Sequence, residues 1–153
     1  MTPSYTFRDG VMEEVPDHIV AEDAVIDHPI NNTVIIQAGA HLVTRSAVSG
    51  TVRIEDGEWE AQADVNGTVD VGPRGRATFF QRVGGTLRVA VGGVAQIAPG
   101  AVALGTMRVD GELVNEGTRG VSVHGQGRVD DRPGSRVRQP DEIRPDGSVA
   151  YRS

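Results

Sequence analysis

The chain of 153 residues contains no cysteine, and only 4% of its residues are aromatic. Without cysteine, the protein has no disulfide framework and no thiolate site. With so few aromatic side chains, its core must consist mainly of valine, isoleucine, leucine and alanine. The length suits one domain rather than two.

Long apolar runs are also missing. No window approaches the roughly 20 apolar residues of a membrane span, and the first residues lack a basic stretch followed by an apolar one. We therefore expect no membrane span and a cytoplasmic location. The formal net charge of −6 argues against nucleic-acid binding, which usually requires a basic face.

Motifs that carry catalytic or metal chemistry are not recognisable either. The four histidines lie at scattered positions: His18, His28, His41 and His124. The glycine-rich stretch GGTLRVAVGG lacks the Lys and Ser/Thr that end a phosphate-binding loop. No serine, histidine and acidic residue share a catalytic spacing. These observations predict no metal, no cofactor and no enzymatic activity.

The chain is rich in glycine, with 20 residues, and it repeats itself. A seven-residue motif recurs at successive offsets of 18, 17, 18, 20 and 20 residues. Such a near-constant period is typical of repeat architectures. The six copies are INNTVII at 30–36, VSGTVRI at 48–54, VNGTVDV at 65–71, VGGTLRV at 83–89, ALGTMRV at 103–109 and the looser VHGQGRV at 123–129.

Within each copy apolar residues alternate with polar ones, as in a half-buried β-strand. Turn signals separate the copies, and no stretch between residues 30 and 129 has helical spacing. We therefore predict an all-β, parallel β-solenoid of about six triangular coils, each of about 17 to 20 residues, in which every motif is one rung. The predicted core rungs are Val52, Ile54, Val69, Val71, Leu87, Val89, Met107 and Val109.

The sequence contains evidence for either handedness of the coil. Small or aliphatic residues recur every six positions over parts of the chain, which favours the left-handed hexapeptide helix as an alternative. The phase of this pattern breaks between Ile54 and Val65. Parallel crossover connections are strongly biased to the right hand. We therefore favour a right-handed β-helix.

The rungs VSGTVRI, VNGTVDV, VGGTLRV and ALGTMRV, with the intervening GPRG and GGVAQI turns, resemble those of the bactofilins, bacterial polymer-forming cytoskeletal proteins. The resemblance covers roughly residues 30–129. It implies a right-handed triangular β-helix that joins end to end into filaments without nucleotide. Residues 1–29 contain no membrane-targeting peptide of the kind that bactofilins often carry.

The repeat also predicts the domain organisation. Residues 30–129 form the solenoid, and residues 1–29 form an irregular N-terminal coil or cap. Residues 130–153 contain three prolines and mixed charge, so we expect a C-terminal tail or cap there.

One outward column of the predicted strands is unusual in its charge. Arg88, Arg108 and Arg128 occupy equivalent positions in three successive motif copies. Three like charges on adjacent rungs repel one another unless solvent or an acidic partner screens them. These arginines form the predicted partner-binding stripe.

Three classes of function remain open from the sequence. The first is a structural protein that self-associates through the solenoid ends into polymers or small oligomers. The second is an acidic protein-binding module, such as an adaptor or a toxin-neutralising immunity protein, that uses one solenoid face. The third is an enzyme or lectin-like carbohydrate binder of the β-helix type, for which we find no cluster of carboxylates or aromatic residues.

Overall fold

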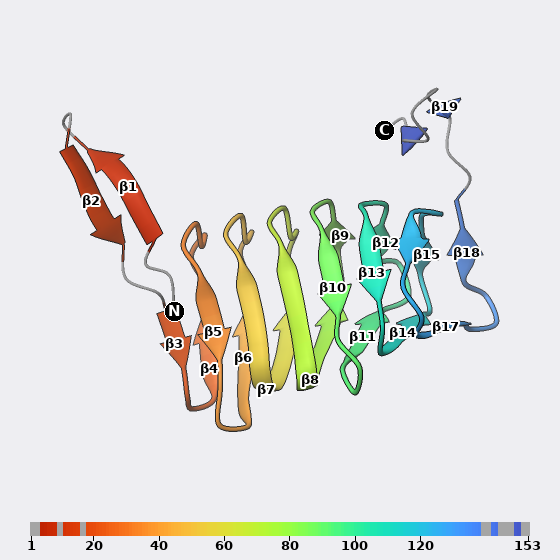
Figure 1. Ribbon diagram of the computed structural model, residues 1–153, viewed down its shortest axis with the longest axis horizontal. Helices are drawn as coiled ribbons and strands as arrows, with labels where there is room; N and C mark the ends of the chain where they lie inside the picture. Colours follow the sequence, from red (N-terminus) through yellow and green to blue (C-terminus); the bar gives the residue numbers. More distant parts are fainter. Residues whose placement is uncertain (1–3, 9–10, 16–17, 139–141, 144–148, 151–153) are drawn as a thin grey trace.

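The structure of the protein, a computed structural model, describes residues 4–8, 11–15, 18–138, 142–143 and 149–150. The described residues form strands, turns and bends without a helix, so none lies in a helix that could cross a membrane. Parallel strands stack into a solenoid with seven rungs (Figure 1). The predicted all-β solenoid is therefore confirmed.

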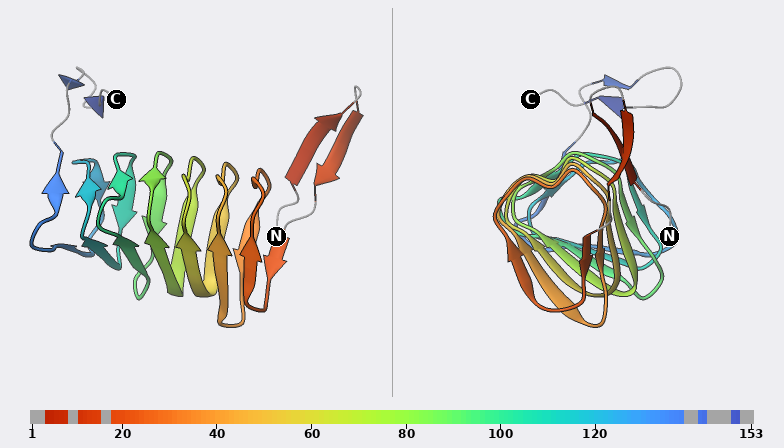
Figure 2. Two further views of the ribbon diagram at one scale, coloured as in Figure 1. Left: turned by 180° about the vertical axis from the view of Figure 1, so that it is seen from behind. Right: turned by 90° about the vertical axis from the view of Figure 1, so that its left-hand side faces the viewer.

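Each turn of the chain passes through three faces, and successive turns overlie one another in the end-on view of Figure 2. Face 1 carries the motif strands. It consists of β3 (His18–Val20), β5 (Val34–Ile36), the first part of β7 (Val52–Ala61), the first part of β8 (Val69–Phe79), β10 (Leu87–Val89), β13 (Met107–Val109) and β16 (Val123–His124).

Face 2 follows face 1 around a corner of the coil, and the long strands β7 and β8 run through that corner. Its members are β4 (Ala24–Ile26), β6 (Ala40–Thr44), the second parts of β7 and β8, β11 (Val94–Ile97), β14 (Glu112–Asn115) and β17 (Arg128–Asp131).

Face 3 closes each turn with shorter pairings. Its strands are β9 (Arg82–Val83), β12 (Val102–Ala103), β15 (Thr118–Arg119) and β18 (Arg136–Val137). In the earlier coils single parallel bridges take their place, between Ile30 and Val48, Val48 and Val65, and Val65 and Val83.

The coil is right-handed. In Figure 1 the chain descends the nearer side of the stack along β5, β10 and β13, and returns behind it while advancing from left to right. The favoured handedness is confirmed, and the left-handed hexapeptide helix is not formed. The period of about 18 residues, rather than six, sets the geometry of each turn.

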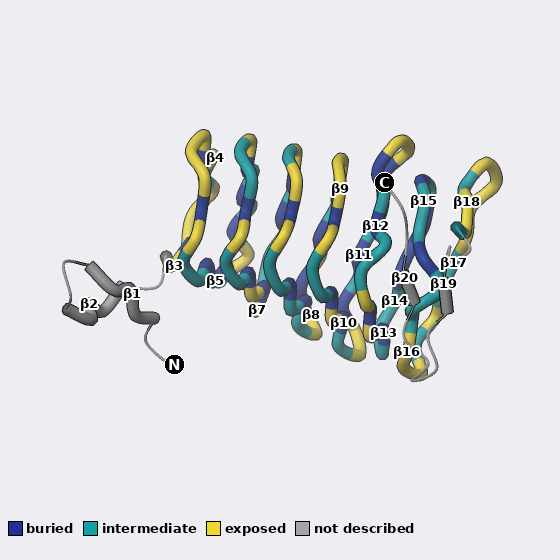
Figure 3. The backbone as a smooth tube through the Cα atoms, turned by 90° about the horizontal axis from the view of Figure 1, so that it is seen from above, coloured by how far each residue is buried: buried dark blue, intermediate teal, exposed yellow. Residues whose placement is uncertain are grey.

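The eight predicted rung residues line the interior of face 1. They form two columns along the solenoid axis, one from Val52 to Met107 and one from Ile54 to Val109. None is more than 2% exposed. Figure 3 shows buried residues along the inner side of the coils and exposed residues at their outer turns.

The largest side chains of the core lie on face 2. Trp59 is 1% exposed, and its Nε1–H donates to Thr44 Oγ1 at 3.0 Å. Its ring meets Phe79 of the next coil edge to face, with centroids 5.6 Å apart. One buried indole therefore ties together three successive coils, each through a defined contact.

The glycine of the repeated motif is required by close packing between coils. A Cβ atom on Gly67 would lie 1.8 Å from the carbonyl oxygen of Gly50 one coil earlier. A Cβ on Gly85 would lie 2.0 Å from the carbonyl oxygen of Gly67. Only a residue without a side chain fits at this corner of the stack.

The stack extends beyond the predicted limits at both ends. Strands β3 and β4 pair in parallel with the next coil, so residues 18–29 form a regular coil rather than an irregular one. At the other end β17 and β18 continue the pairing to Val137. These coils were not predicted because they lack the V-x-G-T motif, although apolar residues occupy most of their inward positions.

Two further pairs of strands lie outside the parallel stack. Strands β1 (Ser4–Arg8) and β2 (Val11–Val15) form an antiparallel hairpin, and β19 (Glu142–Ile143) pairs antiparallel with β20 (Val149–Ala150). The remaining residues of the predicted terminal caps, 1–3, 9–10, 16–17, 139–141, 144–148 and 151–153, lie outside the described part of the chain.

Candidate functional site

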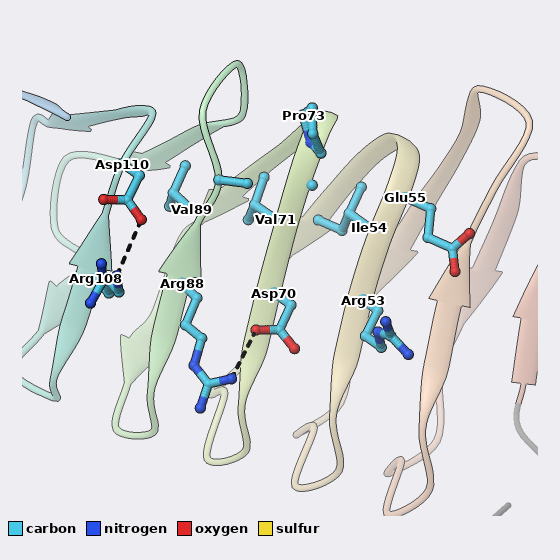
Figure 4. A pocket seen from close by; sticks show the side chains of 12 residues that line it. Arg53, Ile54, Glu55, Asp70, Val71, Pro73, Arg88, Val89, Arg108 and Asp110 are labelled. Atoms are coloured by element: carbon cyan, nitrogen blue, oxygen red, sulfur yellow. Dashed lines mark hydrogen bonds and ion pairs between the residues drawn. The ribbon is translucent and has the colours of Figure 1, made fainter. Parts of the chain in front are cut away.

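The outward column of face 1 contains most of the charge that the sequence singles out. Arg53, Asp70, Arg88 and Arg108 lie on four successive rungs, as Figure 4 shows. Arg88 Nη1 lies 3.8 Å from Asp70 Oδ1, and Arg108 Nε lies 3.2 Å from Asp110 Oδ2. Two of the three arginines in this column are therefore already paired with carboxylates.

Arg128 does not belong to this column, and the predicted stripe of Arg88, Arg108 and Arg128 is wrong in this respect. His124 follows Arg108 on face 1, whereas Arg128 lies on face 2 opposite Glu112. The step from Arg88 to Arg108 is 20 residues, and the step from Arg108 to His124 is only 16.

Shorter corners explain the change of step. The corners 90–93 and 98–101 have four residues each, whereas the equivalent corners of the next coil, 110–111 and 116–117, have two each. The motif alignment therefore places the loose copy VHGQGRV four residues out of register with the stack: His124, rather than Arg128, lies opposite Arg108. Its Val123 and Val129 both face inward, on different faces of the coil.

A shallow hollow of about 500 Å³ lies over the charged column. Its lining includes the small residues Gly72 and Ala90. The arginines border one side of it, and Glu55 and Asp110 stand near its two ends (Figure 4). Within the described part of the chain, the Arg53 guanidinium has no ion-pair partner. The hollow mixes both signs of charge and suits a polar partner surface better than a simple anion.

Asp110 also links the last two coils. Its Oδ1 accepts the backbone N–H of Gln126 at 3.2 Å, and its Oδ2 accepts Arg108 Nε. These two hydrogen bonds, the backbone one first, hold the pKa of the Asp110 carboxyl below its usual range. The charged form of this aspartate therefore stabilises the attachment of the last coil.

The interior of the last coil is less buried than that of the other coils. Val123, Val129 and Val137 occupy the inward column positions of its three faces, yet Val123 and Val129 are only half-buried and Val137 is 37% exposed. Their equivalents in earlier coils, such as Met107 and Leu113, are at most 1% exposed. Among the described strands, β16, β17 and β18 are paired on one edge only.

A polar cluster replaces the aliphatic core at this end. Arg119 stands in the inward column of Ala103, and its Nε and Nη2 donate to Asp131 Oδ1 and Oδ2 at 2.9 Å each. Asn115, which is fully buried, donates from Nδ2 to Asp131 Oδ1 at 3.0 Å and accepts the Gly117 N–H at 3.1 Å. Each polar group of the cluster therefore has a partner.

The cluster fixes the charge of its aspartate. The hydrogen bonds from Arg119, and next those from Asn115, hold the pKa of the Asp131 carboxyl below its usual range, although partial burial opposes them. Asn115, Arg119 and Asp131 were not predicted from the sequence. The available signal was the appearance of charged and amide residues at positions where earlier coils carry Ile97 and Ala103.

The first coil differs from the last. Among its inward residues whose burial the structure describes, Val20, Ile26 and Ile30 are 3%, 6% and 2% exposed and the small Ala24 is half-buried. The two ends of the stack therefore differ. The inward Val20, Ile26 and Ile30 of the first coil are more buried than the inward valines of the last coil, and only the last coil contains the polar cluster of Asn115, Arg119 and Asp131.

Clustered metal ligands do not occur in the described residues, where no three His, Cys, Asp or Glu side chains lie together. No protein-family model, curated protein or solved structure matches the chain. The geometry of the faces and of the two ends thus provides the evidence on function.

Proposed function

We propose that the protein is a structural β-solenoid that self-associates through an end of its coil stack into small oligomers or polymers. The observation that carries this proposal is the half-exposed apolar set Val123, Val129 and Val137 on the last coil. Burial of apolar surface contributes about 25 cal/mol per Å² to association, and a further coil on this end would complete that burial.

The unpaired edge supports the same proposal. Strands β16, β17 and β18 present backbone N–H and C=O groups along the free side of the last coil. Such an edge pairs readily with another chain. The resemblance of the V-x-G-T rungs to those of the bactofilins favours a structural role of this kind, without nucleotide or metal.

The proposal is tested by light scattering and negative-stain microscopy of the full chain over a wide range of concentration. We expect the mean mass to rise with concentration, and we expect Val137→Asp to reduce this rise because it places a charge on the open end. Val91→Asp is the matched control, since Val91 is 73% exposed on a lateral corner. A constant monomer mass for the wild type would refute the proposal.

A second candidate function is a protein-binding module that uses the hollow of face 1. The unpaired Arg53 and the open arrangement of charges favour it. The variant in which Arg53, Arg88 and Arg108 are all replaced by glutamine removes the positive side of the hollow. Loss of a partner that the wild type binds, with self-association unchanged, would establish this function.

A further inference from the structure

Strand β17 has a sequence that is complementary to a second copy of itself. It reads Arg128-Val129-Asp130-Asp131 and forms the free edge of face 2. Val129 lies in the inward column of Leu113, so Arg128 and Asp130 point outward on either side of it. A positive and a negative residue thus flank one inward valine.

Antiparallel pairing of this edge with a copy of itself has few acceptable registers. Residues directly opposite each other in an antiparallel pair lie on the same face, so inward residues must meet inward residues. A two-fold axis at Val129 places Arg128 opposite Asp130 of the partner subunit, twice. An axis at Arg128 or at Asp130 instead places like charges opposite each other, which is unfavourable.

We propose that two copies join through their C-terminal coils in a closed two-fold dimer, with β17 pairing antiparallel to itself about Val129. The inference rests on the proposed function. It adds that the partner is a second copy of the chain and that the interface is formed by the last coil of each copy. In this dimer Val129 meets Val129 of the partner subunit, and the half-exposed interior of each last coil is covered by the other. Two charge pairs fix the register.

The charged side chains of β17 fit this joint. Arg128 is exposed, and its guanidinium has no ion-pair partner among the residues that the structure describes. Asp130 accepts Arg132 Nε at 3.1 Å through Oδ2. A carboxylate has several acceptor sites, so it can bind a second guanidinium without losing the first.

The unequal ends of the stack make the assembly closed. A two-fold joint uses the same surface of both subunits and leaves no second copy of that surface free. In the first coil the inward Val20, Ile26 and Ile30 are already buried, so a further joint there would bury little of the coil interior. Its exposed apolar residues, Ile19 at 49% and Val25 at 53%, lie on the outward side of the coil. Growth therefore stops at two subunits rather than continuing as a filament.

The test is a charge swap, measured by sedimentation equilibrium of the full chain. We expect Arg128→Asp and Asp130→Arg each to weaken the dimer about tenfold or more, because each creates two like-charge contacts. The double variant Arg128→Asp, Asp130→Arg restores opposite charges across the joint and should regain wild-type affinity. Arg76→Asp makes the same charge reversal on face 2 of a central coil, where Arg76 is exposed, and should leave the dimer unchanged.

Any other outcome contradicts the proposed dimer, and each one also shows whether self-association itself still holds. If neither single variant weakens the wild-type dimer, or if the double variant does not restore it, the dimer uses another surface. Self-association is then still supported. Wild-type chains that lengthen with concentration show that the assembly is not closed, and they also leave self-association standing. A monomer at all concentrations refutes both the dimer and the proposed function.

Discussion

Arg119 holds Asp131 in the last coil by two parallel hydrogen bonds of 2.9 Å, at positions where earlier coils carry aliphatic side chains. Arg119 is only 16% exposed as a side chain. A bidentate pair of this kind has a fixed geometry as well as a favourable energy. The last coil is therefore held by this polar cluster in addition to the packing of Val123 and Val129 against the core.

The Arg119–Asp131 pair should contribute to the stability of the last coil. We expect Arg119→Gln to lower the local free energy of opening by about 1 to 2 kcal/mol, because it leaves the Asp131 carboxylate without its bidentate partner. Hydrogen exchange of the amides of β17 and β18 measures this loss. Arg132→Gln breaks a surface pair, with Arg132 53% exposed as a side chain, and should change exchange little.

Acid should loosen the same coil. Asp110 and Asp131 both have pKa values below their usual range in the folded protein. Their contribution is complete above the unfolded value of about 3.9, and it is lost as the pH falls through the lower folded values. We expect the protection factors of the amides in residues 123–137 to fall below about pH 4, before those of the central coils fall.

Asp131→Asn provides the control for this pH dependence. The variant should show weaker protection of the last coil at neutral pH and a smaller further loss in acid, since one of the two titrating groups is absent. Equal acid sensitivity of the central and last coils would contradict the assignment of these carboxylates to the attachment of the last coil.

A charge in a rung should destabilise the whole stack. Val109 is 1% exposed, so Val109→Asp buries a carboxyl group without a partner and should cost at least about 3 kcal/mol of unfolding free energy. Thermal or denaturant unfolding followed by circular dichroism measures the effect. Val91→Asp, at a 73% exposed valine, should change stability by less than about 0.5 kcal/mol.

Adjacent glycines should respond differently to the same substitution. Gly85→Ala places a Cβ 2.0 Å from the carbonyl oxygen of Gly67, so two coils must move apart, with an expected loss of about 2 to 4 kcal/mol. In Gly84→Ala the nearest atom, Asn66 Oδ1, is 3.8 Å away. This variant should be neutral, and similar unfolding midpoints for both would refute the close packing at the motif glycine.

Local patterns in the sequence were sufficient for much of the fold. Alternation of apolar and polar residues places Val52, Ile54 and their equivalents in the interior, because a strand exposes alternate residues to the core. The near-constant period predicts the stacking, since coils of similar length bring the same positions together. The motif glycine follows from the same periodicity, although its physical reason is visible only in the contact between coils.

The placement of Arg128 required information that the motif does not contain. Two corners of the coil that follows Arg108 are each two residues shorter than the equivalent corners after Arg88. The alternation of apolar and polar residues in the strands does not report the length of the corners between them. The polar cluster of Asn115, Arg119 and Asp131 was missed for a related reason. Its members come from three strands and meet only after the register of the last coils is known.

The most direct test of the account is sedimentation of the wild-type full chain across a wide range of concentration. We expect a reversible shift from monomer to dimer that reaches a plateau, because the last coil, with Val123, Val129 and Val137 half-exposed, becomes covered by a second copy. A single monomeric species at every concentration would contradict the claim that the open end of the stack is an assembly surface.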